Sequence, residues 1–399
     1  MAMIVQPSDR LRRLGSSIFS EIAEWKAEAV AAGFDIIDLG IGSPDKPPVE
    51  PVRRTLSEAA LREDVYGYPT SEGSLAFRRA ACDWLAHRFG IDIDPASEAT
   101  VLMGSQDGLG HLALAVTNPG DLAIVPDPGY PIYGAGLVVA GVEAYPVPLR
   151  ESNGFLIDFD AIPEDVARRA KLIVVNYPSN PLGAVADRSF YETLISFAKK
   201  YNILIVHDAA YSELAFDGYK PMSVLELPGA KDVAIEFHSV SKSFNLAGLR
   251  LAYAVGNAQA VQALRALKSN LDYGVFLAAQ EAGIRAFAAD LSNEGAKAAA
   301  VYESRRDVFV EAMREAGWHV PKPKATMFIW ARIPEGWTSR QISQEICRRT
   351  GVVVVPGSEY GVEGEGYVRI GLVQEESKLL EAARRIGTFF REHGLTVSY

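Results

Sequence analysis

The chain reads KLIVVNYPSNP over residues 171–181 and ILIVHDAAY over residues 203–211. Each stretch begins with a short run that is apolar on both faces and ends in polar residues, which is typical of strands in a buried parallel sheet. Similar runs occur at 121–126 (DLAIVP), 234–239 (AIEFHS) and 250–256 (RLAYAVG), with helical patterns between them. The sequence therefore predicts an α/β protein with a mostly parallel sheet.

The rest of the chain predicts helices around this sheet and a second unit beside it. Helical spacing is present at 17–32 and 73–89, and a helix over 187–201 begins with an Asp suited to its N-cap. After residue 290 a long helical stretch precedes the short runs ATMFIWARI, VVVVPG and YVRIGL and a C-terminal helix. We expect a large domain at 46–285, and a smaller α+β domain made of 1–45 together with 286–399.

Composition excludes several classes of protein. The 399 residues carry 40 Lys and Arg against 50 Asp and Glu, a net charge of −10, which argues against a nucleic-acid partner. The only cysteines, Cys82 and Cys347, form no C-x-x-C motif, so neither a disulfide framework nor a thiolate metal site is expected. We find no signal-peptide pattern and no apolar run of about 18 residues. The sequence predicts a cytoplasmic protein without a membrane span or a metal.

Lys242 is the strongest candidate for chemistry. It lies in SVSKSFNLAGLR, residues 239–250, within an apolar and hydroxyl-rich segment that also contains Ser239 and Arg250. A buried amine is costly unless it is neutral or covalently used, for example in a Schiff base with an aldehyde cofactor. The alternative is that Lys242 follows a strand and points into solvent.

Asp208 and Tyr211 form a second candidate group, in HDAAY at residues 207–211. A carboxylate at the end of an apolar strand needs a cation, and a protonated pyridine nitrogen is one such cation. Tyr211 would then donate to a phenolic oxygen on the same ring. The alternative for Asp208 is a strand-ending Asp that caps the next turn, and we interpret His207 as structural.

Four further residues each allow a binding interpretation and a structural one. Ser105 and Gln106 precede a helical pattern and suit a phosphate at a helix N-terminus, or an ordinary N-cap. Arg369 lies on an otherwise apolar strand, where it suits a substrate carboxylate or a buried ion pair. Tyr130, in PDPGYPIY, suits a platform for an aromatic ring, or simple packing.

Taken together and in this order, these motifs resemble the class I/II aminotransferases of pyridoxal-phosphate fold type I. The resemblance extends from LGIGSPD (39–45) to YVRIGL (367–372). NYPSNPLGAVAD and EFHSVSKSFNLAGLRLAYAVGN are most similar to the LL-diaminopimelate aminotransferase-like branch. The resemblance implies a seven-stranded sheet between helices, pyridoxal 5'-phosphate as cofactor, and a homodimer with shared active sites that acts on amino acids and 2-oxo acids.

The resemblance also implies a role for each residue. Lys242 forms the aldimine and moves the proton in a ping-pong reaction, and Asp208 pairs with the pyridinium. Tyr211 and Asn180 bind the phenolic oxygen, and Tyr130 stacks on the ring. The phosphate ligands are Ser105, Gln106, Ser239, Arg250 and, from the partner subunit, Tyr68, with Tyr66 as the alternative. Gly42, Asn180 and Arg369 hold the substrate carboxylate.

The chain departs from the family pattern at a few positions. Gln106 stands where many relatives have Lys, and Leu182, Leu249 and Tyr273 replace the usual Thr, Trp and Ser. None of these changes touches the chemistry of Lys242. Amino transfer is the expected reaction, and the alternative is a lyase of the same fold that acts by β- or γ-elimination.

Overall fold

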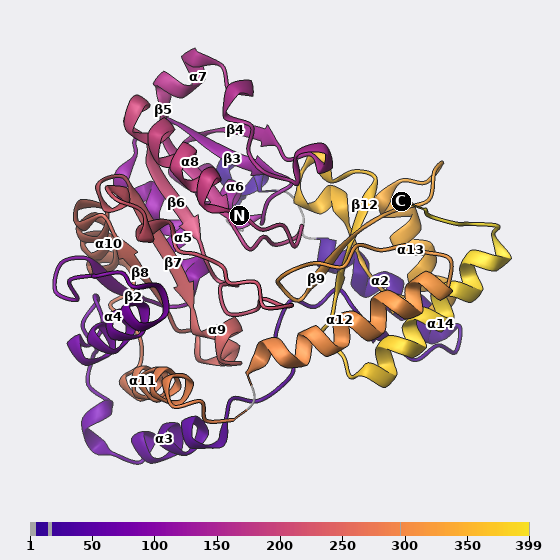
Figure 1. The fold of residues 1–399 in the computed structure, drawn as a ribbon, viewed down its shortest axis with the longest axis horizontal. Helices are drawn as coiled ribbons and strands as arrows, with labels where there is room; N and C mark the ends of the chain where they lie inside the picture. The colour runs from indigo at the N-terminus through magenta and orange to yellow at the C-terminus, as the bar shows by residue number, and fades with distance from the viewer. Residues whose placement is uncertain (1–4, 15–17, 296, 399) are drawn as a thin grey trace, which may run out of the picture.

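The computed structural model describes residues 5–14, 18–295 and 297–398, and Figure 1 shows their arrangement. The centre of the larger part is a seven-stranded sheet with the strand order β2-β8-β7-β6-β5-β3-β4. Its strands are β2 (Ala99–Leu102), β3 (Leu122–Asp127), β4 (Glu143–Pro148), β5 (Ala170–Asn176), β6 (Leu204–Asp208), β7 (Ala234–Ser239) and β8 (Ala252–Gly256). The pairs from β4 through β7 are parallel, and only β8 runs antiparallel to its neighbours. The predicted mostly parallel, seven-stranded sheet is confirmed.

Helices cover both faces of this sheet because successive strand residues point to opposite sides. Ile205 belongs to the core on one face, and the next residue, Val206, belongs to the core on the other. One face packs against α5 (Ser105–Val116), α6 (Ile132–Ala140) and α10 (Ala258–Leu271). The opposite face packs against α4 (Leu75–Phe89), α7 (Glu164–Arg169), α8 (Arg188–Tyr201) and α11 (Leu277–Leu291). The strands are therefore buried on both faces, as their unbroken apolar runs predict.

A second unit, on the right of Figure 1, has its own core. It contains the antiparallel sheet β11-β12-β9 and the parallel pair β1-β10. These strands are β1 (Ile37–Asp38), β9 (Phe328–Arg332), β10 (Val352–Val353), β11 (Val355–Pro356) and β12 (Tyr367–Gly371). Around them lie α2 (Ile18–Ala31), α12 (Ala298–Glu315), α13 (Ser339–Thr350) and α14 (Glu376–Glu392). The pairing of β1 with β10 brings the N-terminal segment into the same unit as the C-terminal part of the chain. The domain boundaries at 45/46 and 285/286 stay a prediction.

The two units are joined by hydrogen bonds as well as by the chain. Asp127, at the end of β3, accepts bonds from the backbone N–H groups of Val362 (3.2 Å) and Glu363 (3.1 Å). Gly361, the residue before Val362, has a φ of +136°, and a Cβ there would come within 1.9 Å of an Asp127 carboxylate oxygen. Because only glycine fits this close approach, Gly361 allows the loop that bears Tyr360 to rest against the large sheet.

Some elements differ from the sequence expectation. The strands β2 and β4 were not among the predicted runs; β4 reads EAYPVP, so two prolines and an exposed Glu obscure the apolar pattern of an edge strand. VVVVPG was expected as one run, but it divides into β10 and β11, which pair with different sheets. The helix predicted at 187–201 is α8, and Asp187 caps it by accepting from the Phe190 N–H.

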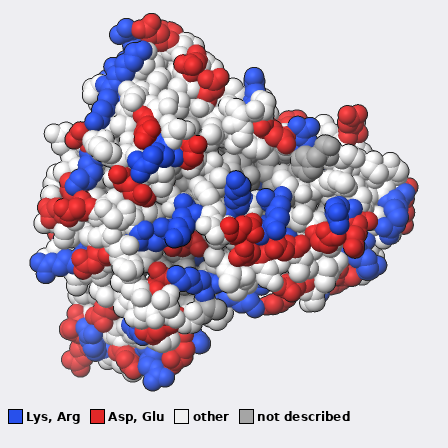
Figure 2. Space-filling view, viewed as in Figure 1, with Lys and Arg blue, Asp and Glu red and all other residues white. Residues whose placement is uncertain are grey.

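The surface carries both signs of charge. On the face in Figure 2, acidic and basic side chains are interspersed. Some ion pairs lie within one helix, such as Arg384 with Glu381 in α14. The short helix α1 (Asp9–Arg13) has no buried residue, and α3 (Glu50–Ala60) packs against α11 at the lower edge of Figure 1. Within the described ranges, no helix is long and apolar enough to cross a membrane. The cytoplasmic location stays a prediction.

Candidate active site

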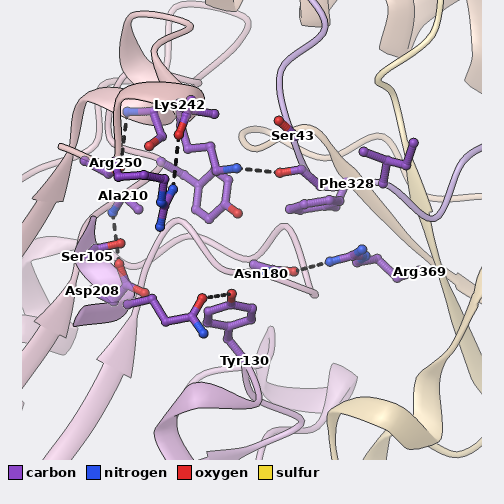
Figure 3. Close-up of a pocket in the computed structure, with 18 of the residues that line it drawn as sticks. Ser43, Ser105, Tyr130, Asn180, Asp208, Ala210, Lys242, Arg250, Phe328 and Arg369 are labelled. Atoms are coloured by element: carbon purple, nitrogen blue, oxygen red, sulfur yellow. Dashed lines mark hydrogen bonds between the residues drawn. The ribbon is translucent and has the colours of Figure 1, made fainter. Parts of the chain in front are cut away.

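A cavity of about 580 Å³ lies where the carboxyl ends of the sheet strands face the second unit (Figure 3). This position is expected for open α/β sheets, because side chains and backbone groups converge beyond the strand ends. The predicted residues that line the cavity are Gly42, Ser105, Gln106, Tyr130, Asn180, Asp208, Tyr211, Ser239, Lys242, Arg250 and Arg369. Tyr66 and Tyr68 do not line it. The fold therefore gathers into one place residues that are more than 300 positions apart.

Lys242 faces the cavity from α9 (Val240–Ser243), the short helix that follows β7. Its Nζ donates a hydrogen bond to the Gly42 backbone oxygen, so it does not point into solvent. Burial lowers the pKa of Lys242 to about 8, and the positive charges of Arg369 and Arg250 add to this effect. The neutral amine, which is the form that acts as a nucleophile or base, is therefore reached closer to physiological pH than in an exposed lysine.

Asp208 ends β6 and is almost completely buried. Its Oδ2 accepts from the Tyr133 hydroxyl at 2.8 Å, and its Oδ1 accepts from the Ala210 N–H at 3.2 Å. Among the described residues, neither Lys nor Arg forms a salt bridge with it. Burial raises the pKa of Asp208, whereas these two hydrogen bonds lower it. The carboxylate is therefore available to a cation that enters the cavity.

Tyr211 and Asn180 lie near this carboxylate. Burial raises the pKa of Tyr211, so its hydroxyl keeps its proton and remains a donor. Asn180 follows β5, and its backbone N–H donates to the Asn176 side chain at 2.8 Å. Asn176 also donates to the Asp208 backbone oxygen at 2.7 Å, so it ties the ends of β5 and β6 together. This link holds Asn180 in the cavity wall.

Arg369 is on β12 and only 6% exposed. Its guanidinium donates to the Asn180 side-chain oxygen at 3.0 Å and to the Gly40 backbone oxygen at 2.7 Å, while its Nε has no partner. It lies over the rings of Phe328 and Tyr360, at 4.2 and 5.1 Å from their centroids. No described carboxylate pairs with it, which excludes the alternative of a buried ion pair within the described chain. The arrangement suits an incoming carboxylate.

Ser105 and Gln106 begin α5, opposite Arg250. Gly104 precedes them at a φ of +87°, and a Cβ there would come within 2.5 Å of the Arg250 guanidinium. Backbone N–H groups at the start of this helix, the serine hydroxyls and the guanidinium together suit a phosphate. Gln106 accepts from the Tyr130 hydroxyl at 3.1 Å, so it also orients that ring.

Sequence reasoning missed several residues of the cavity. Tyr133, Ser241, Phe328 and Ser43 also line it. Tyr133 follows Tyr130 by three positions, and helical spacing offered a signal that both face the same side. Phe328 offered none, because an apolar residue in a strand is expected in any core.

A cluster of titratable groups lies behind the first turn of α5. Asp107, His111 and Asp272 place ligand atoms within 4.8 Å of one another, as at a metal site. However, the Lys268 ammonium lies 2.8 Å from Asp107 and 3.0 Å from Asp272, and its side chain is completely buried. Lys268 thus supplies the positive charge that these carboxylates need.

The family model for class I and II aminotransferases matches residues 35–386. The chain belongs to this family. LL-diaminopimelate aminotransferase from Moorella thermoacetica is 47% identical to it over 383 residues, which are 96% of this chain and 98% of that protein. The enzyme of the same name from Halothermothrix orenii is 45% identical over 382 residues, with the same coverage.

Solved structures show the same fold. Substrate-bound BacF from Bacillus subtilis matches with a TM-score of 0.92 and 37% identity, and the match covers 100% of both chains. A probable N-succinyldiaminopimelate aminotransferase from Thermus thermophilus matches with a TM-score of 0.87 and 39% identity, over 93% of this chain and 100% of that one. The predicted family and fold are confirmed, and the chain is a pyridoxal-phosphate-dependent aminotransferase.

The residues of the cavity fit pyridoxal phosphate. Asp208 has no cationic partner in the described chain and suits the protonated ring nitrogen, and the space kept open by Gly104 beside Arg250 suits the phosphate. Lys242 offers an amine whose lowered pKa makes it easier to deprotonate than an ordinary lysine, as bond formation to an aldehyde requires. The ring nitrogen, the phosphate and the aldehyde of pyridoxal phosphate each have a chemically complementary group in this cavity.

The lowered pKa of Lys242 gives a testable prediction. In enzyme stripped of its cofactor, the amine is protonated below about pH 8 and neutral above it, whereas an ordinary lysine titrates near 10.4. We expect the rate of acetylation of Lys242, followed by peptide mass spectrometry against pH, to show a midpoint near 8. Arg369→Gln removes a nearby positive charge and moves the midpoint upward. A wild-type midpoint near 10 contradicts the burial argument.

Proposed function

We propose that this aminotransferase carries its cofactor on Lys242 and transfers the α-amino group of LL-diaminopimelate to a 2-oxo acid in a ping-pong reaction. One observation carries the proposal: the cavity brings together half-buried Lys242 with buried Asp208 and Arg369, and these three ionisable groups form no salt bridge with one another. An amine, a carboxylate and a guanidinium in this arrangement match a cofactor aldehyde, a ring nitrogen and a substrate carboxylate. The choice of LL-diaminopimelate as substrate is supported by the sequence identity of this chain, 47% and 45%, to the LL-diaminopimelate aminotransferases of M. thermoacetica and H. orenii.

Bound pyridoxal phosphate supplies an aldehyde for the substrate amine and a ring that withdraws electrons from it. Asp208 would pair with the protonated ring nitrogen, and Tyr130 would provide the platform on which the ring stacks. Tyr211 and Asn180 donate hydrogen bonds to the phenolic oxygen. The phosphate ligands of this chain are Ser105, Gln106, Ser239 and Arg250.

Lys242 moves the proton that defines amino transfer. With cofactor and substrate bound, the neutral Nζ of Lys242 would accept the proton from the substrate Cα and hold it for return to the product. The same groups act in reverse on the 2-oxo acid, which completes the ping-pong cycle. The lowered pKa keeps this amine ready to accept a proton.

Arg369 holds the substrate while this proton moves. Its planar fork matches the α-carboxylate with two parallel hydrogen bonds, with help from Asn180 and the backbone at Gly42. The rings of Phe328 and Tyr360 fix the plane of the fork and keep water from it. The α-carbon is thereby positioned toward Lys242.

An amino-transfer assay tests the proposed substrate. Purified enzyme with LL-diaminopimelate and a panel of 2-oxo acids should form the corresponding amino acids, and Lys242→Ala should abolish this. The same panel is run with every standard amino acid as donor. A better donor than LL-diaminopimelate contradicts the substrate, and release of ammonia and pyruvate without an acceptor indicates the lyase.

The role of Arg369 predicts a selective loss in one variant. Arg369→Lys keeps the charge but not the fork, and a hydrogen bond to a charged group contributes about 1.5–3 kcal/mol. We expect kcat/KM for α-amino acids to fall roughly ten- to a hundredfold. Amines without an α-carboxylate, assayed in the same way, are the control and should change little. Equal losses for both substrate types contradict the proposed contact.

Exposed aromatic residues support a homodimer with shared active sites. Tyr68 is 90% exposed and Tyr273 61% exposed, although their rings lie 5.4 Å apart. Leu61, Leu271 and Phe276 add to the exposed apolar surface nearby in sequence, and such surface is typical of protein interfaces. The Tyr66 hydroxyl already donates to the Ala60 backbone oxygen. Tyr68 is therefore the better candidate to reach the partner's phosphate.

Hybrid dimers test this arrangement. Lys242→Ala and Tyr68→Ala subunits are inactive alone, but a hybrid has one site that combines an intact Lys242 with an intact Tyr68. Random pairing makes half of the dimers hybrids, so we expect on the order of a quarter of wild-type activity after subunit exchange. Lys242→Ala mixed with Arg369→Lys is the control, because neither site of that hybrid is complete. No recovery despite exchange, followed by native mass spectrometry, contradicts the crossed loop.

A further inference from the structure

We propose that Tyr133 is a positioning residue that orients both Asp208 and the ring of Tyr130. The inference rests on the proposed pairing of Asp208 with the cofactor ring nitrogen. Tyr133 does not need to touch the reacting atoms for this role, because it acts through two residues that do.

The first contact is a buried hydrogen bond. The Tyr133 hydroxyl donates to Asp208 Oδ2 at 2.8 Å, and Tyr133 and Asp208 are only 5% and 4% exposed. The remaining Asp208 oxygen receives one weaker backbone bond, from Ala210 at 3.2 Å. Tyr133 is therefore the one described side chain that donates to this carboxylate.

A buried carboxylate with a single backbone donor prefers to be neutral. Burial acts in that direction on Asp208, and the bond from Tyr133 opposes it. The hydroxyl also fixes which lone pair of the carboxylate is used, so that the other edge faces the cavity. Removal of the hydroxyl thus weakens both the charge and the orientation that a protonated ring nitrogen needs.

The second contact is between aromatic rings. Tyr133 meets Tyr130 edge to face, with centroids 5.9 Å apart and planes at 81°. Tyr130 is held at its other end by its hydrogen bond to Gln106. The Tyr130 ring therefore has a fixed tilt, which a platform for a planar cofactor requires.

The two contacts arise from one short segment. Tyr130 lies two residues before α6 begins and Tyr133 is in its first turn, so the backbone bond from the Tyr133 N–H to the Tyr130 oxygen at 3.0 Å sets their spacing. Asp208 comes from β6, 75 positions along the chain. Tyr133 thus links the platform on one side of the cofactor to the carboxylate at its ring nitrogen.

The test compares two cofactors in three variants. Wild type should bind pyridoxal phosphate more tightly than its 1-deaza analogue, in which a C–H replaces the ring nitrogen and cannot pair with Asp208. In Tyr133→Phe this ratio of dissociation constants should shrink roughly ten- to a hundredfold, because only the natural cofactor loses its partner. Tyr133→Leu also removes the ring edge and should weaken binding of both compounds.

Tyr177→Phe is the matched control. Tyr177 is equally buried and donates to the Phe155 backbone oxygen at 3.0 Å, away from Asp208. Loss of the Tyr177 hydroxyl should leave the ratio of the two dissociation constants unchanged. As a second readout, the ¹⁵N resonance of labelled bound cofactor should move toward the unprotonated position in Tyr133→Phe and not in Tyr177→Phe.

The outcomes distinguish an error in the proposed pairing of Asp208 from an error in the role of Tyr133. If wild type binds both cofactors equally, the proposed pairing of Asp208 is wrong. If wild type discriminates and Tyr133→Phe does so equally, the pairing stands and the inference on Tyr133 is overturned. Equal weakening of both compounds in Tyr133→Phe also overturns it, because that is the result of a purely structural role.

Discussion

The site depends on the cost of burying charge. Asp208 and Arg369 are buried and Lys242 is half-buried at the edge of a closely packed sheet, and the folded chain does not pair these three groups with one another. Isolated buried charges are expensive, so they persist only where neutral hydrogen bonds reduce the cost or a ligand later supplies the missing partner. In the proposed function, each of the three meets a different part of the cofactor or the substrate.

The parallel sheet makes the arrangement possible. β5, β6 and β7 run in the same direction, so their last residues, Asn176, Asp208 and Ser239, lie at one edge. The backbone there has left the ladder, and its polar groups can face a ligand rather than a neighbouring strand. Side chains with little freedom, such as Asp208 and Asn180, come from these strand ends. Their positions are therefore as rigid as the sheet itself.

The second unit completes the cavity from the opposite side. Arg369 reaches across to Asn180, while the Asp127 carboxylate binds the loop that bears Tyr360, and Tyr360 in turn covers Arg369. These contacts couple the placement of Arg369 to the end of β3, which is followed by the loop of Tyr130. The proposed carboxylate site and the proposed cofactor platform therefore depend on the same hydrogen bonds between the two units.

The sequence by itself determined the central strands β3, β5, β6, β7 and β8 and the buried character of the sheet, but not β2 or β4. An apolar run that ends in Asp or Asn reports burial and a polar edge regardless of what surrounds it, so Asp208 was identifiable, whereas Asn180, four residues beyond such a run, was assigned by the family resemblance. The sequence could not show whether Arg369 forms an ion pair or is free to bind an anion, because that depends on which side chains from distant segments lie beside it. Tyr133 is the clearest case: its value comes from a carboxylate 75 positions away. Only tertiary structure decides such matters, since hydrogen bonds and charges act through distances in space that local patterns do not encode.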